Sequence, residues 1–121
     1  GSTPAALKRA AVRGDGWLPQ GVPEMGMEKA ITLIHAERAK VLGDAPIEIG
    51  MTTPWMYLGK PAFDVGANAL TGSPAEIASV LRERKKLGVH HLGLRFRSRS
   101  CDELVEQIER FGSEVGPLLN D

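Results

Sequence analysis

The stretch LGVHHLGLRF, residues 87–96, decides the fold class of this protein. From residue 89 onward it predicts a strand whose side chains alternate between two faces. One face is polar or small and the other is apolar: His91, Gly93 and Arg95 against Leu92, Leu94 and Phe96. A parallel sheet covered by helices on both sides requires apolar residues on both faces. The polar face therefore favours a barrel, in which that face lines the interior.

A second expected strand, residues 47–51, shows the same alternation. Its apolar set and its polar or small set are Ile47, Ile49 and Met51 against Glu48, Gly50 and Thr52. We therefore predict that Glu48 pairs with His91 or Arg95 across neighbouring strands, inside the barrel. The alternative is that the strand ends simply expose these charges to solvent.

Further outward, strand and helix patterns alternate along the chain. Periodicity, capping residues and Gly or Pro stops predict strands at 16–18, 47–51 and 89–96. The same signals predict helices at 5–13, 27–42, 74–87 and 101–111, with 115 as an alternative end for the last. This alternation implies an α/β fold with parallel strands and right-handed crossovers. A sheet of about three strands has two open edges, which predict association with another chain.

A long stretch without a regular pattern, residues 52–71, follows the second expected strand. Loops of this length are usually functional or disordered, not simple connectors. Its large side chains include Trp55, Met56, Tyr57 and Phe63. They indicate either a binding or lid role or a small cluster packed within the loop.

Arg38 interrupts the apolar stripe of the helix expected at 27–42. The stem of an arginine can pack on an apolar surface while its charge reaches water. We predict that arrangement for Arg38.

Composition narrows the class of function. The 121 residues carry 15 basic and 15 acidic side chains, which gives no argument for nucleic acid or an anionic membrane as partner. The single cysteine, Cys101, forms no internal disulfide, and no apolar run approaches the length of a membrane span. We predict a cytoplasmic setting. His90 and His91 are adjacent in a strand and point to opposite faces, so no metal site is expected there.

Three segments resemble the C-terminal region of the luciferase-like monooxygenase superfamily of flavin- or F-420-dependent oxidoreductases. They are GSTPAAL at 1–7 leading to GDGWLP at 14–19, GSPAE at 72–76, and LGVHHL at 87–92 with the closing helix. The resemblance implies that residues 1–121 are one segment of a (β/α)8 TIM barrel. The segment would supply the C-terminal portion, with about three parallel strands alternating with four helices. It cannot close a barrel alone.

The resemblance also implies a cofactor, either FMN or the deazaflavin coenzyme F-420. In the family, the strand end and helix start before the Gly-Asp-Gly-Trp segment hold the cofactor phosphate, which places Gly1, Ser2, Thr3 and Trp17 at the cofactor. Free N–H groups at a helix start attract phosphate, and Gly allows close approach. The alternative is that Gly1 and Ser2 are a cloning scar and Thr3 is only a helix cap.

Arg97 and Arg99 follow the last expected strand, where many barrels bind phosphate. We predict that Arg97 contacts the anionic cofactor. The alternative is a solvated loop.

The chemistry implied by the resemblance is hydride transfer or monooxygenation of an organic small-molecule substrate. Family members place their catalytic residues largely in the N-terminal half, so none is assigned here. The resemblance thus implies a cofactor-binding part that pairs with that half or with itself. The alternatives are a non-catalytic barrel subunit or scaffold, and an inactive truncated fragment.

Overall fold

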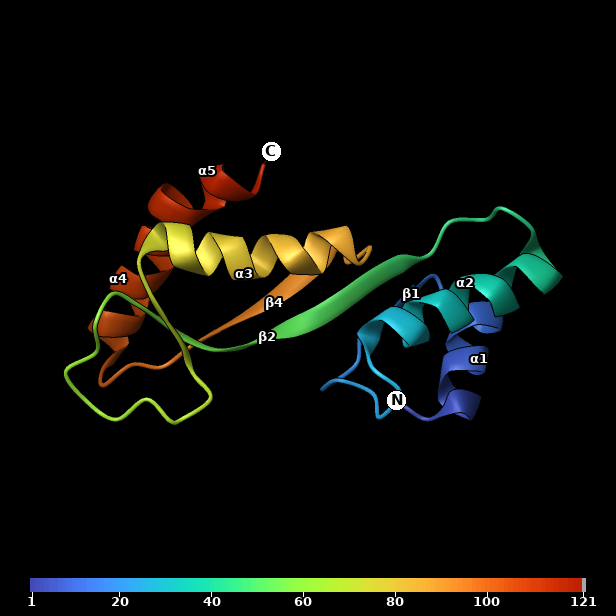
Figure 1. The fold of residues 1–121 in the computed structure, drawn as a ribbon, viewed down its shortest axis with the longest axis horizontal. Helices are drawn as coiled ribbons and strands as arrows, with labels where there is room; N and C mark the ends of the chain where they lie inside the picture. The colour runs from blue at the N-terminus through green and yellow to red at the C-terminus, as the bar shows by residue number, and fades with distance from the viewer. Residues whose placement is uncertain (121) are drawn as a thin grey trace. The chain divides into compact units, whose positions relative to one another are not determined.

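The computed structural model describes residues 1–120 and shows a mixed α/β chain. Most of its elements are labelled in Figure 1, where the colour runs from blue at the N-terminus to red at the C-terminus. The elements are α1 (Pro4–Arg13), β1 (Gly16–Trp17), α2 (Met27–Leu42), β2 (Glu48–Leu58), β3 (Leu70–Gly72), α3 (Pro74–Lys86), β4 (His91–Phe96), α4 (Cys101–Arg110), the π-helix η1 (Phe111–Val115) and α5 (Gly116–Leu119).

The sheet is built around β2, which pairs with each of the other three strands. β1 pairs parallel with the start of β2, and β3 pairs parallel with its end. On either side of β4, the backbone N–H of His90 donates to Ile49 O at 2.7 Å, and that of Arg97 donates to Met56 O at 2.9 Å. Because both bonds join residues at the same offset in sequence, β4 runs in the same direction as β2. The predicted α/β class with parallel strands is confirmed.

The chain divides into two compact units, and β2 and β4 contribute to both. The first unit comprises Gly1–Thr52 and Lys85–Gly93. The second comprises Thr53–Arg84 and the residues from Leu94 onward. We describe each unit by itself.

The first unit has an apolar core between α1, α2 and the strands. Its buried members are Leu7, Ala11, Trp17, Met27, Ala30, Ile31, Ile34, Ile47, Ile49, Met51 and Val89. Thr3 begins α1 as predicted, because its Oγ1 accepts a hydrogen bond from the Ala6 N–H at 3.2 Å. The apolar set expected on the second strand, Ile47, Ile49 and Met51, is buried in this core.

The second unit packs α3 and the C-terminal helices around the end of β2 and of β4. Ser73 caps α3 by accepting from the Glu76 N–H at 3.2 Å. Gly72 just before it has φ +127°, and a Cβ there would collide with the Glu76 carboxylate. Phe96 meets Phe111 edge to face, with ring centroids 5.8 Å apart. These contacts join β4 to η1 in the unit's apolar interior.

The structure corrects the expected end of the second strand, which was placed at residue 51. β2 continues to Leu58, and β3 adds a fourth strand at Leu70–Gly72, so the irregular stretch is 59–69 and not 52–71. Burial along β2 explains the difference. Thr53 is buried, Trp55 is exposed, and Met56 is buried again, so the two-residue alternation shifts by one position around Pro54. A proline within a strand and a one-residue shift of the alternation both make a strand hard to identify from its sequence.

Other boundaries also differ from expectation, most of them by one or two residues. β4 begins at His91 instead of residue 89, and α3 ends at Lys86 instead of 87. The last helix stops as α-helix at Arg110 and continues as η1 and then α5, so Pro117 lies within a short helix instead of beyond one. Pro is tolerated there because it occupies the first turn of α5.

Arg38 is also corrected, because its charge is buried and does not reach water. The residue is only 5% exposed. Its guanidinium donates to four backbone carbonyls: Ala45 O at 2.9 Å, Ala11 O at 2.9 Å, Gly14 O at 2.7 Å and Pro46 O at 2.7 Å. The carbonyls at the end of α1 lack helical partners and carry the negative end of the helix dipole, so they suit a buried cation. Arg38 thereby ties the end of α1 to the segment that leads into β2.

Candidate functional site

Four of the five residues predicted to bind a cofactor lie together in the first unit. The indole Nε1–H of Trp17 donates to Gly1 O at 3.0 Å, although the two residues are 16 positions apart. Trp17 is buried in the core of this unit. The indole therefore fixes the position of the chain just before α1.

Ser2 and Thr3 line a depression of about 480 Å³ together with Pro4, Glu24 and Met25. The Thr3 hydroxyl already accepts the Ala6 N–H, so its role as a helix cap is established. A free hydroxyl hydrogen remains on Thr3 for a ligand, because a capping hydroxyl only accepts. The Glu24 carboxylate makes this side of the segment unfavourable for an anion.

Gly1 and Trp17 line a second depression, of about 380 Å³. Its rim includes two basic residues of α1, Arg9 and Arg13. Residues four apart lie on one face of a helix, which is why both arginines line the same depression. Sequence reasoning missed both arginines, although their spacing on an expected helix was the available signal. The arrangement offers two positive charges beside Gly1, which is a suitable environment for a phosphate.

The predicted contact between Glu48 and His91 is present, with 3.1 Å between His91 Nε2 and Glu48 Oε2. It lies on an exposed face, since the two side chains are 69% and 62% exposed. His90 lies beside the same carboxylate, and its Nδ1 accepts the Ile49 N–H at 3.0 Å. Arg95, the other partner considered for Glu48, instead donates through Nε to Thr53 O at 2.8 Å. The Glu48 and His91 side chains therefore lie on the exposed surface of the strands and not in an enclosed site.

Arg97, the fifth predicted cofactor residue, belongs to the second unit. Its guanidinium lies 4.1 Å from the ring centroid of Trp55. The guanidinium of Arg95 lies 5.0 Å from the same ring. Trp55, one of the large side chains noted in the stretch 52–71, therefore makes a cation–π contact with both arginines.

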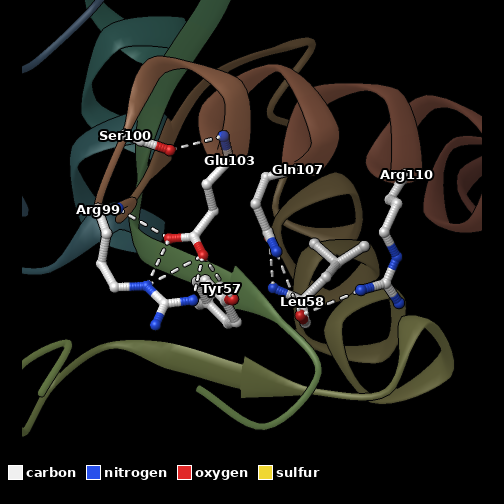
Figure 2. Close-up of polar contacts among 7 residues, drawn as sticks. All are labelled: Tyr57, Leu58, Arg99, Ser100, Glu103, Gln107 and Arg110. Carbon is white, nitrogen blue, oxygen red and sulfur yellow. Dashed lines mark hydrogen bonds and ion pairs between the residues drawn. The ribbon is translucent and has the colours of Figure 1, made fainter. Parts of the chain in front are cut away.

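Arg99 is held by Glu103, as Figure 2 shows. Arg99 Nη2 lies 2.6 Å from Glu103 Oε2, and the backbone N–H of Arg99 donates to Oε1 at 2.8 Å. The Tyr57 hydroxyl donates to the same carboxylate at 3.3 Å. The hydrogen bonds from Arg99 hold the pKa of Glu103 below its ordinary value, and Glu103 in turn raises the pKa of Arg99. Arg99 therefore forms an ion pair with Glu103 of the same chain.

Gln107 occupies the turn of α4 next to Glu103 and is buried. Its Oε1 accepts the Leu58 N–H at 2.7 Å, and its Nε2 donates to Leu58 O at 3.4 Å. Arg110 Nη1 also donates to Leu58 O at 3.4 Å. Side chains of α4 thus replace a neighbouring strand at the last residue of β2. These contacts join α4 to the end of β2.

Other features of the described residues offer little further chemistry. Within 1–120 no group of three His, Cys, Asp or Glu side chains is placed to hold a metal ion, and Cys101 is exposed. None of the helices in this range is long and apolar enough to cross a membrane. No protein-family model matches the sequence, and no curated protein matches it either.

Proposed function

We propose that this chain is the C-terminal, cofactor-binding part of a luciferase-like oxidoreductase that uses coenzyme F-420 or FMN. The observation that carries the proposal is the depression beside Gly1 and Trp17, with Arg9 and Arg13 on its rim. Gly1 and Trp17, which the family resemblance places at the cofactor, line this depression together with two positively charged side chains that can attract a phosphate. The volume of the depression is near the lower limit for ligand-binding pockets. It therefore suits the phosphate end of a cofactor, with the remainder of the cofactor outside it.

The residues present fit such a cofactor end. The Trp17 indole holds Gly1 in place by donating a hydrogen bond to the Gly1 carbonyl. Because Gly1 has no side chain, a phosphate can approach its backbone closely. When bound, the cofactor would supply hydride transfer or monooxygenation of an organic small-molecule substrate. This chain would bind and orient it, with the catalytic residues supplied by the N-terminal half of the barrel.

FMN and riboflavin provide a direct test, because they differ by the phosphate alone. Either flavin is added to the protein, and quenching of flavin fluorescence is followed to high micromolar concentration. We expect FMN to bind and riboflavin to bind at least about tenfold more weakly, since a charge-assisted contact to phosphate is worth about 1.5–3 kcal/mol. F-420 is titrated in parallel by absorbance.

The matched variants are Arg9→Gln with Arg13→Gln, and Lys8→Gln as the control. Lys8 is an exposed cation of the same helix that does not line the depression. The double variant should lower FMN affinity to that of riboflavin, and the control should bind FMN as the unaltered protein does. Equal affinity for FMN and riboflavin would refute a phosphate site. Absence of binding to both cofactors would remove the proposal for this chain, unless the N-terminal half restores it.

The partial barrel and its partner belong to the same proposal. β4 pairs with β2 alone among the strands in 1–120, which leaves its second edge free of a described strand. We propose that this edge pairs with the N-terminal half of the barrel or with a second copy. Sedimentation of the chain, alone and with that half, measures the association. A monomer under both conditions would contradict it.

A further inference from the structure

Two positive side chains share one tryptophan in the second unit. Arg97 and Arg95 place their guanidinium carbons 4.1 Å and 5.0 Å from the centroid of the Trp55 ring. Each cation gains from the ring, but two cations this close together also repel each other. The pair is therefore stabilised by any negative group that binds between them.

No carboxylate of the described chain, 1–120, forms an ion pair with either arginine. Arg95 uses its Nε on Thr53 O, and its backbone N–H donates to Thr53 Oγ1 at 3.1 Å. The backbone N–H of Arg97 donates to Met56 O, which holds the residue at the end of β4. These contacts fix both side chains at their bases. The terminal nitrogens of both guanidinium groups remain available as donors.

The arginines and Trp55 line a pocket of about 310 Å³ together with the loop around Gly66 and Asn68. No acidic residue lines it. The nearest carboxylate in sequence, Asp64, turns back on its own loop and accepts the Gly66 N–H at 2.9 Å. The Asn68 side chain adds an amide donor on the loop side. The pocket thus combines two cations, an amide and an aromatic wall, with no competing negative charge.

We infer that this pocket binds a small oxyanion, a phosphate or carboxylate group, between Arg95 and Arg97. A guanidinium presents parallel N–H donors that match both groups, and stacking on Trp55 preorganises the Arg97 fork. The inference goes beyond the proposed function and shares no residue with the depression beside Gly1. Phosphate binding here and FMN binding there can therefore succeed or fail separately.

The experiment follows the two indole N–H signals by ¹⁵N NMR, with Trp55→Phe used to assign them. The protein is titrated with inorganic phosphate, with succinate and with chloride at constant ionic strength. We expect the Trp55 signal to shift saturably with phosphate or succinate, with a Kd of about 1 mM or tighter, and not with chloride. The Trp17 signal should not follow the same curve. A response to phosphate alone assigns the site to phosphoryl groups, and a response to succinate alone assigns it to carboxylates.

Arg97→Gln should weaken the response at least about tenfold, because it removes one of the two cations. Arg99→Gln is the matched control, since that arginine pairs with Glu103 and does not line the pocket. It should leave the response intact. If Arg97→Gln loses its dispersed spectrum, Arg97→Lys keeps the charge without the fork and should still weaken binding. Equal responses to all three anions, or an unchanged response in the folded Arg97 variants, would overturn the inference.

Discussion

The two units of this chain stabilise the ends of their elements by different means. In the first unit, one buried cation, Arg38, collects four backbone carbonyls from α1 and from the segment before β2. In the second, a neutral amide, Gln107, satisfies both backbone groups of one residue, Leu58. The first arrangement concentrates several unsatisfied groups on one charge, and the second replaces a single missing strand contact. The cost of removing each side chain should therefore differ.

A buried polar side chain contributes most to stability where it satisfies several backbone groups at once. The guanidinium of Arg38 serves two carbonyls at the end of α1 and two in the segment before β2, so all four lose their donor when the side chain is removed. An amide that satisfies one N–H and shares one carbonyl with Arg110 has a smaller consequence. The two tryptophans allow each unit to be followed separately, because Trp17 is in the first and Trp55 in the second.

Arg38→Met should have the largest effect on stability. The variant keeps most of the apolar stem but leaves one buried and three partly buried carbonyls without their donor, which should cost about 3–5 kcal/mol in total. Urea denaturation followed by Trp17 fluorescence in a Trp55→Phe background measures it. Arg38→Lys keeps the charge but not the planar fork of donors, so its stability should lie between that of the unaltered protein and that of Arg38→Met. A loss below about 1 kcal/mol in Arg38→Met would show that water replaces the guanidinium without penalty.

Gln107→Leu should have the next largest effect, in the second unit. It keeps the size of the side chain but leaves the Leu58 N–H buried and unpaired, at a cost of about 1–3 kcal/mol. The exposed neighbour Glu106 supplies the control Glu106→Gln, which should lie within about 0.5 kcal/mol of the unaltered protein. Denaturation is followed by Trp55 fluorescence in a Trp17→Phe background, with all variants made in it. A Gln107 variant as stable as the control would mean that Leu58 needs no partner.

The sequence predicted those features that depend on local signals. The caps at Thr3 and Ser73, and the apolar faces of α2 and of the start of β2, follow from spacing of a few residues. Arg38 was misplaced because its four carbonyl partners lie 7 to 27 positions away. No periodicity within one helix shows that such groups will converge on it.

The same limit applies to the candidate sites. Trp55 and Arg97 were each noted in the sequence, but their contact depends on the pairing of β4 with the extended part of β2. That part was expected to be a loop, because Pro54 and the shift in alternation break the strand pattern. The contact between Glu48 and His91 was predictable because both strands kept a simple period of two. Its exposure was not, since a sequence does not show which face remains uncovered.

Glu103→Gln should change how stability responds to acid. The pKa of Glu103 is lowered in the folded protein by Arg99, so its ionised form adds stability above the ordinary value of 4.5. That contribution is lost as the pH falls below 4.5 towards the folded-state pKa. The variant should be slightly less stable at neutral pH and should lose less stability between about pH 6 and about pH 3. Glu109→Gln, exposed on the same helix, is the control, and parallel acid curves for both variants would contradict the expectation.

Glu48→Gln should have the smallest effect and completes the comparison within the first unit. The pair with His91 is short but exposed on both sides, so solvent screens it and its two side chains lose freedom to form it. We expect a change of at most about 0.5 kcal/mol, measured by Trp17 fluorescence as for Arg38. A double-mutant cycle with His91→Gln isolates the interaction from the effect of each substitution alone. A coupling above about 1 kcal/mol would mean that the carboxylate is shielded from water, as the interior of a closed barrel would shield it, because an exposed pair does not reach that value.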